Sequence, residues 1–160
     1  MNSADLCDHY GAELRILPVD WQWFGAQRQF SGQVVTLYAL GCNGEIRQKL
    51  AEPGAGRVLV IEAGGDPGAL LGDRLGALAV TNGWAGVLIN GNVRDRRALA
   101  GLELGILALG SWPRRSHNRE GGKLDVPLLL GGVCVEPGDW LYADEDGVLL
   151  ARQEIALPKR

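Results

Sequence analysis

The sequence predicts one α/β domain with layered sheets. In the front half, segments with the apolar spacing of helices alternate with short apolar runs that are typical of buried strands. In the rear half, short strands follow one another between glycine turns. A chain of 160 residues is long enough for one sizeable core, and no repeat or low-complexity linker divides it. We therefore expect a single domain over residues 1–160, built from an alternating part and a mainly β part.

Four elements are expected before residue 63. Pro53-Gly54-Ala55-Gly56 is a strong breaker and separates the last two of them. The four are a short helix over residues 3–10, a strand over 32–40, an amphipathic helix over 43–52 and a buried strand over 57–62.

A third helix is expected between residues 73 and 82. The glycine-rich stretch 64–68 breaks the chain before it, and residues 69–71 read as the start of a helical turn that Gly72 interrupts. Asp73 stands where the N-cap of the helix would be. Asn82-Gly83 ends the helix, since both residues tolerate the left-handed conformation of a C-terminal cap.

The remaining elements follow in short steps. Residues 87–89 form an apolar run like a buried strand, and residues 91–93 then open a loop that carries Arg94 and Asp95. Beyond it we expect a short helix over 96–102, a strand over 106–109, a polar, basic and mobile loop over 111–122, and strands over 126–130, 133–135, 140–143 and 148–151.

The most informative pattern is Asp73, then twenty residues, then Arg94 and Asp95. A helix followed by a strand can bring the start of the helix beside the end of the strand, so these side chains would share a pocket. Free N–H groups from Gly72 to Leu75 would form an anion site at the helix start. Arg94 would offer a planar fork to a carboxylate or enolate oxygen, and Asp95 an oxygen ligand of the kind that magnesium prefers.

Each part of this pattern also has a purely structural interpretation. An Arg-Asp pair after a strand is most often a surface ion pair, and an aspartate at a helix start is most often only a cap. Taken alone, the spacing favours these interpretations over a metal site.

Short segments along most of the chain match a known family in order: Ala4-Asp5-Leu6-Cys7-Asp8, Phe24-Gly25, Phe30-Ser31-Gly32, residues 56–61, 72–75, 82–86, 91–95, 113–116, 131–133 and 137–147. Together they resemble the RraA family, which includes the class II 4-hydroxy-4-methyl-2-oxoglutarate aldolases. The resemblance implies a layered β/β/α swivelling-type fold. It also implies a homotrimer or a dimer of trimers, with the site in a cleft between neighbouring subunits.

The resemblance also bears on activity. Aldolase-like members carry the spacing of Asp73, Arg94 and Asp95, whereas related regulators of RNase E typically lack the full acidic set. The chain therefore resembles the catalytic branch. It departs from the family where Glu62-Ala63-Gly64-Gly65 replaces the commoner Asp-Gly-Gly-Gly, and its tail after Leu150 is shorter than that of some aldolases.

The resemblance implies a metal-dependent lyase that releases pyruvate from 2-oxo-4-hydroxy acids such as 4-hydroxy-4-methyl-2-oxoglutarate. Asp95 would hold Mg²⁺ or Mn²⁺, Arg94 would favour the enolate, and the backbone amides of Gly72, Asp73, Arg74 and Leu75 would fix the substrate carboxylate. Asp73 would orient a water ligand of the metal. Either that water or a carboxylate that the sequence does not identify would take the proton of the C4 hydroxyl.

Related chemistry narrows the hypothesis further. The motif contains no lysine for a Schiff base. The same electron sink serves β-decarboxylation, so oxaloacetate decarboxylation is the expected side activity. The alternative from another functional class is a non-catalytic regulator that binds and inhibits RNase E. A quinone methyltransferase, a name also attached to the family, is set aside because no strand is followed by G-x-G-x-x-G.

Composition excludes several functional classes. A net charge of −3 and an isoelectric point near 5.4 argue against a nucleic-acid binder. No signal peptide or membrane-spanning run is apparent. Cys7, Cys42 and Cys134 lack metal-ligand spacing and are interpreted as reduced structural thiols, so we expect a cytoplasmic protein.

Three further features have competing interpretations. The acidic stretch 139–146 is interpreted as turns rather than a calcium loop, because it lacks the EF-hand spacing. The basic loop around His117 is interpreted as a solvated surface or as an attractor of anionic oxo-acids; its cations are Arg114, Arg115, Arg119 and Lys123. Trp21 and Trp23 share one face of an extended segment, which suits the core or a subunit interface.

Overall fold

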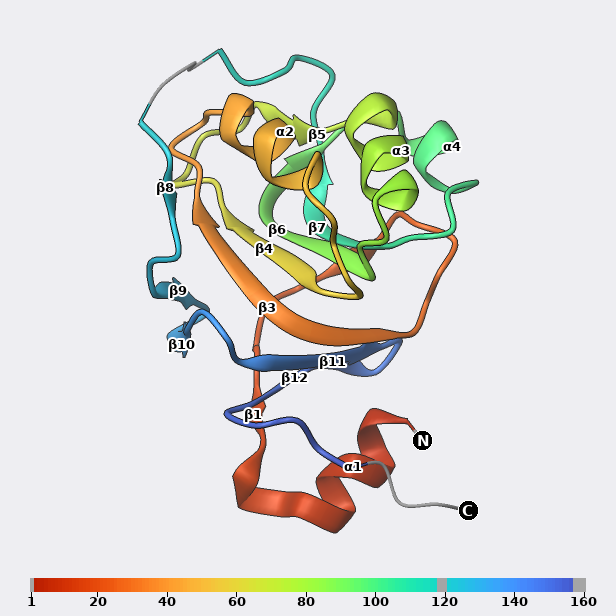
Figure 1. Cartoon of the computed structure of the whole chain (residues 1–160), viewed down its shortest axis with the longest axis vertical. Coiled ribbons are helices and arrows are strands. Elements are labelled where there is room, and N and C mark those ends of the chain that lie inside the picture. Colours follow the sequence, from red (N-terminus) through yellow and green to blue (C-terminus); the bar gives the residue numbers. More distant parts are fainter. Residues whose placement is uncertain (1, 118–120, 157–160) are drawn as a thin grey trace.

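A strongly curved sheet forms the centre of the molecule, in a computed structural model that describes residues 2–117 and 121–156 (Figure 1). The helices are α1 (Ser3–Tyr10), a 3₁₀ turn η1 (Gly11–Glu13), α2 (Gly44–Leu50), α3 (Asp73–Thr81) and α4 (Arg96–Leu99). The strands are β1 (Arg15–Ile16), β2 (Gln22–Trp23), β3 (Phe30–Tyr38), β4 (Val58–Glu62), β5 (Ala69–Leu71), β6 (Gly86–Val93), β7 (Gly105–Ser111), β8 (Lys123–Leu124), β9 (Leu128–Leu130), β10 (Val133–Val135), β11 (Trp140–Asp144) and β12 (Gly147–Ala151).

Strand β3 joins two differently paired parts of the sheet. Its first residues, 30–33, pair antiparallel with β11, and residues 34–38 pair parallel with β4. On one side the order continues through β4, β6 and β7, all parallel, to β2 at the edge. On the other side it continues through β11 and β12 to β1, all antiparallel. The expected alternation of helices and strands followed by a β-rich part is confirmed.

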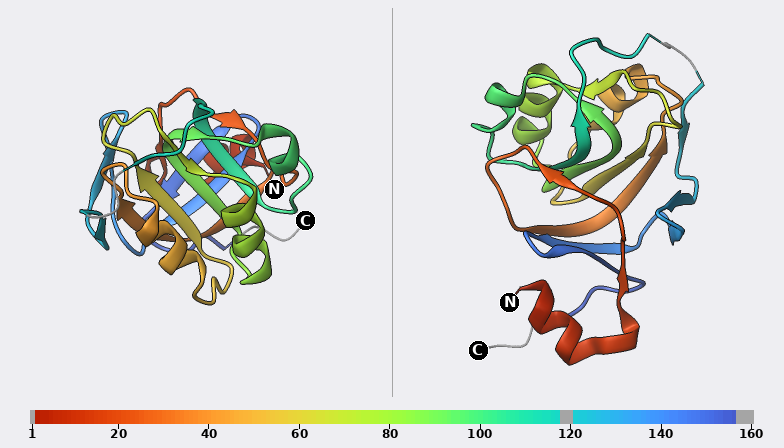
Figure 2. Two further views of the ribbon diagram at one scale, coloured as in Figure 1. Left: turned by 90° about the horizontal axis from the view of Figure 1, so that it is seen from above. Right: turned by 180° about the vertical axis from the view of Figure 1, so that it is seen from behind.

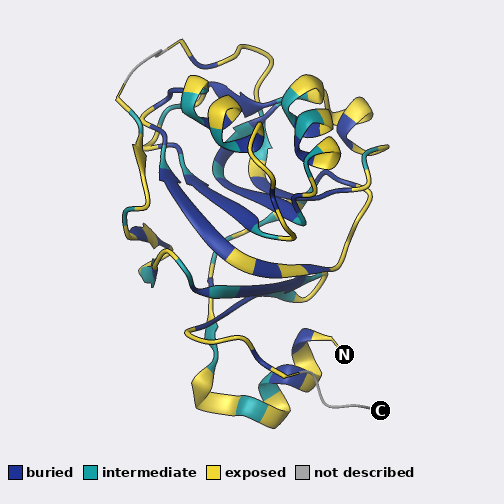
Figure 3. Cartoon of the chain, in the orientation of Figure 1, coloured by how far each residue is buried: buried dark blue, intermediate teal, exposed yellow. Residues whose placement is uncertain are grey.

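The parallel strands are apolar on both faces because each face is covered. Leu59 and Ile61 of β4 face the core beneath α2 and α3, whereas Val58 and Val60 face the core that β11 and β12 close from the other side. Figures 1 and 2 show α2, α3 and α4 together on one face of the curved sheet. Figure 3 shows the strands mostly buried and the outer faces of these helices exposed. This burial accounts for the unbroken apolar run of β4.

The first helix lies beneath β11 and β12, away from the other helices (Figure 1). Its Leu6 packs with Tyr142 and Leu149 in a small separate core. The Asp144 carboxylate accepts hydrogen bonds from the N–H of Ser3 at 2.6 Å and from its hydroxyl at 2.7 Å. Burial, the largest single influence, raises the pKa of Asp144, but hydrogen bonds from Ser3 and from the following turn together lower that pKa below its ordinary value. Asp144 therefore anchors the start of α1 as a carboxylate.

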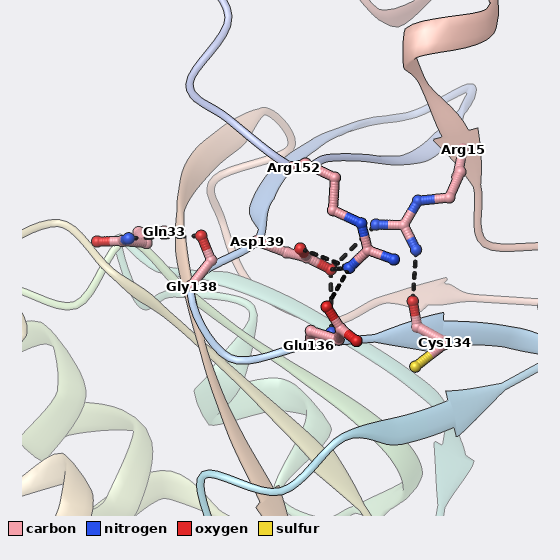
Figure 4. Close-up of polar contacts among 7 residues, drawn as sticks. All are labelled: Arg15, Gln33, Cys134, Glu136, Gly138, Asp139 and Arg152. Carbon is pink, nitrogen blue, oxygen red and sulfur yellow. Dashed lines mark hydrogen bonds and ion pairs between the residues drawn. The ribbon is translucent and has the colours of Figure 1, made fainter.

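Two arginines from distant parts of the chain meet at Asp139, which is 3% exposed (Figure 4). Arg15 donates to Asp139 Oδ2 at 3.0 Å and Arg152 to Oδ1 at 3.1 Å. The same carboxylate accepts the Glu136 N–H, which closes the turn before β11. The turn interpretation of Asp139 agrees with this geometry, but ion pairs from two partly exposed arginines to a buried carboxylate were not expected.

Several boundaries differ from expectation. Residues 69–71 were expected to start a helical turn but form β5, because Ala69 and Leu71 pair with β6. The expected loop at residues 91–93 is also wrong, since β6 continues to Val93. The short edge strands β1, β2 and β8 were not expected, because two-residue runs carry little periodic signal.

Trp21 and Trp23 pack against the core, and their role in a subunit interface stays a prediction. No helix in the described residues is long and apolar enough to cross a membrane.

Candidate functional site

The candidate site lies where β5 and β6 end and α3 begins. These strands are parallel, so their carboxyl ends meet at one edge of the sheet, where α/β proteins commonly bind ligands. The Arg94 N–H donates to the Leu71 carbonyl at 2.9 Å, which ties the end of β6 to the residue before the α3 N-cap. The predicted convergence of Asp73, Arg94 and Asp95 is therefore produced by main-chain pairing.

Asp95 and the start of α3 are joined directly. Asp95 Oδ2 accepts the N–H of Asp73 at 3.0 Å, across 22 residues of sequence. Asp95 has the left-handed backbone conformation, with φ 63° and ψ 45°, which aspartate tolerates better than most residues. Gly72 allows the close approach, because a Cβ placed there would lie 2.7 Å from Asp95 Oδ2. Asp95 thus partly performs the capping role that was expected of Asp73.

The prediction that Asp73 is the N-cap is wrong, since Gly72 occupies that position and Asp73 is the first helical residue. Asp73 Oδ1 accepts the N–H of Arg74 at 2.8 Å. Two of the four expected anion-binding amides, those of Asp73 and Arg74, are therefore already bonded to carboxylates. Among the described residues, the amides of Gly72 and Leu75 have no acceptor and remain able to bind a ligand.

Arg94 is partly buried beside these groups. Its Cγ and Nε would lie 3.5 and 3.7 Å from a Cβ on Gly72, so the guanidinium stem passes close to the α3 N-cap. One terminal nitrogen lies 3.5 Å from the Pro113 carbonyl, at the limit of a hydrogen bond. Arg94 makes no ion pair with any described residue, and its fork remains able to bind an anion.

These groups line one pocket with a volume of about 680 Å³. Its wall continues onto α2 and onto the segment after β7, which supply residues that sequence reasoning did not place there: Asn43, Gly44, Arg47 and Arg115. With Arg74 and Arg94, the lining holds four arginines against two carboxylates, a net charge of two positive. The volume and charge suit a small, multiply charged anion.

The basic loop after β7 is more ordered than expected at its start. The Ala69 N–H donates to the Arg114 carbonyl at 2.9 Å, and the Ser116 N–H donates to the Ala69 carbonyl at 3.1 Å. Arg115 therefore pairs with β5 like a short parallel strand. His117 is exposed, and Arg119 lies outside the described residues.

The donor set fits a divalent cation that takes only part of its coordination from this chain. No three His, Cys, Asp or Glu side chains gather as a metal cage within residues 2–117 and 121–156. Magnesium commonly takes one or two carboxylates and completes its shell with water and substrate. Asp95 suits this role, because only its Oδ2 accepts a hydrogen bond from the described residues.

Comparison with known proteins shows the family of the chain. The sequence model of the RraA-like family, described as Aldolase/RraA, matches residues 3–150. The chain belongs to the RraA-like family. A relative from Laribacter hongkongensis is 46% identical over 92% of this chain and 93% of its own length. A relative from Xanthomonas campestris pv. campestris is 47% identical over 97% of this chain and 93% of its own. Both are provisionally named 4-hydroxy-4-methyl-2-oxoglutarate aldolase.

Solved structures of the family share the fold but differ in their assigned functions. A Geobacillus kaustophilus protein, described as an S-adenosylmethionine:2-dimethylmenaquinone methyltransferase, has a TM-score of 0.94 and 39% identity, over 97% of both chains. A Thermus thermophilis protein, described as the RNA-processing inhibitor RraA, has a TM-score of 0.93 and 41% identity, over 98% of this chain and 95% of its own. The expected RraA-like fold is confirmed, but it does not choose between these functions.

Proposed function

We propose that the chain is a divalent-metal-dependent lyase. It cleaves 4-hydroxy-4-methyl-2-oxoglutarate and similar 2-oxo-4-hydroxy acids by a retro-aldol reaction, with oxaloacetate decarboxylation as a side activity. The observation that carries the proposal is one pocket that is lined by Gly72, Leu75, Arg94 and Asp95. Among the described residues, the amides of Gly72 and Leu75 have no acceptor, and Arg94 forms no ion pair. The names of the relatives that are 41–47% identical support the same substrate class.

The reaction breaks the C3–C4 bond of the substrate. The C4 hydroxyl loses a proton and becomes a carbonyl, while the bonding electrons pass into the pyruvyl half as an enolate. Protonation at C3 then gives pyruvate, so 4-hydroxy-4-methyl-2-oxoglutarate yields two pyruvate molecules. The site must therefore hold a carboxylate, stabilise negative charge on the C2 oxygen and accept a proton from the C4 hydroxyl.

Residues of this chain suit the first two tasks. The amides of Gly72 and Leu75 point from the start of α3 and would bind the C1 carboxylate. Arg94 would lie against the C2 oxygen, where its fixed positive charge favours the enolate over the ketone. Asp73 would orient a water molecule that receives the C4 proton, since its Oδ2 accepts no hydrogen bond from the described residues. Asp95 would hold Mg²⁺ or Mn²⁺, which supplies Lewis-acid polarisation of the pyruvyl oxygens.

The test is pyruvate release from 4-hydroxy-4-methyl-2-oxoglutarate and oxaloacetate by purified protein, with magnesium and with a chelator. Asp95→Ala should abolish release. Asp95→Asn should also remove activity but keep an acceptor for the Asp73 N–H, which separates the loss of a metal ligand from the loss of a helix cap. Turnover that persists with the chelator or in both variants would refute the metal assignment.

A regulator that binds and inhibits RNase E is the second candidate. It is favoured by the Thermus thermophilis structure, which is described as an RNA-processing inhibitor. Such a regulator has no need of a metal ligand at Asp95. Tight, metal-independent binding of RNase E by a protein without lyase activity would reverse the order of the two candidates.

Assembly and location belong to the same proposal. The family resemblance implies a homotrimer or a dimer of trimers with small oxo-acids as ligands. We also propose a cytoplasmic location, which suits three reduced thiols, and neither nucleic acid nor membrane as a partner, which suits the net charge of −3 and the lack of a long apolar run. The Geobacillus kaustophilus structure is described as a methyltransferase, but we do not propose that function here. The sequence of this chain has no G-x-G-x-x-G loop after a strand that could hold a methyl donor.

A further inference from the structure

We infer that Arg47 and Arg115 form a second anion subsite, which selects substrates that carry a carboxylate at the end remote from the pyruvyl group. The inference rests on the proposed function and names two specificity-determining residues for it. Both arginines line the pocket that holds Arg94 and Asp95. They come from α2 and from the segment after β7, whereas the residues assigned to the pyruvyl end come from the start of α3 and from the end of β6.

Arg47 reaches the pocket because of the way α2 packs. Ile46 and Leu50, four residues apart, are fully buried and fix the inner face of the helix. Asn43, Gly44 and Arg47 lie on the adjoining face, at the spacing of one helical turn, and all three line the pocket. In Figure 1, β5 lies between α2 on one side and α3 with α4 on the other. Arg47 therefore enters from the wall opposite the start of α3.

Arg115 is held in place by its neighbours rather than by its own side chain. The hydrogen bonds of Ala69 with Arg114 and Ser116 fix the backbone on both sides of Arg115. Side chains alternate along an extended segment, so the buried side chain of Ser116, which is 5% exposed, leaves that of Arg115 facing the pocket. A fixed backbone lowers the conformational cost of binding through this side chain.

Neither cation is neutralised within the described part of the chain. Arg47 and Arg115 form no salt bridge and donate no side-chain hydrogen bond there. By contrast, Arg15 and Arg152, which have structural roles, are both paired with Asp139. Unpaired arginines that face a cavity are suited to bind a carboxylate by paired, charge-assisted hydrogen bonds. The pyruvyl carboxylate already has its own donors, so the additional positive charge fits a second carboxylate.

The test compares two substrates that differ only at the remote end. One is 4-hydroxy-4-methyl-2-oxoglutarate, and the other is 4-hydroxy-4-methyl-2-oxopentanoate, in which a methyl group replaces the C5 carboxylate. We expect kcat/KM to be about 100-fold higher for the dicarboxylate. Arg47→Gln and Arg115→Gln should each raise the KM for the dicarboxylate about tenfold, with little change in kcat and no change for the monocarboxylate.

Matched variants separate the effect of the subsite from a general effect of removing positive charge. Arg97→Gln removes an exposed arginine of α4 that does not line the pocket and should alter neither substrate. Arg115→Lys keeps the charge but loses the planar fork, so it should recover only part of the preference. The substituted arginines are exposed, and circular dichroism should show an unchanged fold.

A binding experiment keeps the inference independent of turnover. Titration calorimetry in magnesium should show 2-oxoglutarate binding at least tenfold tighter than 2-oxobutyrate, with the difference lost in Arg115→Gln. If no oxo-acid is cleaved but this pattern holds, the lyase proposal fails and the subsite stands. If the variants weaken both ligands equally, or change neither, the subsite is refuted whether or not the protein is a lyase.

Discussion

Replacing Gly72 by alanine should disable the site while leaving the fold intact. The backbone there has φ −135° and ψ −163°, an extended conformation that alanine adopts without strain. The added Cβ would lie 2.7 Å from Asp95 Oδ2, closer than real Cβ contacts come. The carboxylate must retreat by about 0.7 Å to reach 3.4 Å, where ordinary van der Waals contact begins.

The cost in stability should be small. A retreat of that size stretches the 3.0 Å hydrogen bond from the Asp73 N–H beyond about 3.5 Å, where it is effectively lost. Because Asp73 and Asp95 are both exposed, losing this hydrogen bond should lower the free energy of unfolding by about 1 kcal/mol. Alanine restricts the unfolded chain more than glycine does, which raises the free energy of unfolding by about 0.4–1 kcal/mol. The two effects nearly cancel, so the free energy of unfolding should change by less than about 1 kcal/mol.

The cost in activity should be large, because the displaced carboxylate is the proposed metal ligand. A misplacement approaching 1 Å in a catalytic group can cost about 100-fold in rate, so we expect Gly72→Ala to lower kcat/KM for pyruvate release about 10- to 100-fold. The affinity for magnesium, measured by calorimetry, should fall with it.

Gly101→Ala is the matched control. Its new Cβ would meet only the Ala98 carbonyl oxygen, at an ordinary 3.7 Å, and it lies outside the pocket. It should keep both activity and magnesium affinity. A Gly72→Ala protein with wild-type kcat/KM and wild-type magnesium affinity would show that the contact with Asp95 does not matter, and the reasoning would be refuted.

Two further predictions concern the polar anchors outside the pocket. Asp139→Ala should lower the free energy of unfolding, measured in urea, by about 2–3 kcal/mol, because Arg15 and Arg152 lose the carboxylate that they share. Glu136 is half exposed, so Glu136→Ala should lower it by no more than about 0.5 kcal/mol. Equal losses in the two variants would contradict this prediction. Since the folded pKa of Asp144 lies below the ordinary value of 3.8, its stabilisation is present above that pH and lost as the pH falls through the folded pKa. The stability gap between wild type and Asp144→Asn should therefore be full at neutral pH and shrink below pH 3.8, and a gap independent of pH would contradict it.

The sequence predicts the end of the pocket around Asp95 because that end is built locally. Asp73 begins one helix, and Arg94 and Asp95 directly follow the next strand, so their spacing alone indicates that they converge. The periodic signal is also clear for α1 and β4, which form close to where they were expected. The periodic signal fails at residues 69–71, since a three-residue apolar run suits a strand as well as a helical turn. Pairing with β6 makes this segment a strand.

The other end of the pocket depends on contacts that no local pattern encodes. Arg47 becomes a lining residue only because α2 packs on the sheet with Ile46 inward, and Arg115 only because its neighbours pair with Ala69. The same holds for Asp139, which looks like a turn residue in the sequence. Its partner Arg15 is 124 positions away.

The pairing of β1 with β12 affects how the chain can mature during synthesis. Arg15 lies opposite Leu150, and Ile16 opposite Leu149, so residues 15 and 16 have no strand to join until β12 has been synthesised. Contacts between such distant residues form late, because a very long loop must close first. The parallel strands can assemble earlier around their own helices, while residues 15–17 wait with Leu17, which is 2% exposed in the folded protein, open to chaperones and to neighbouring chains.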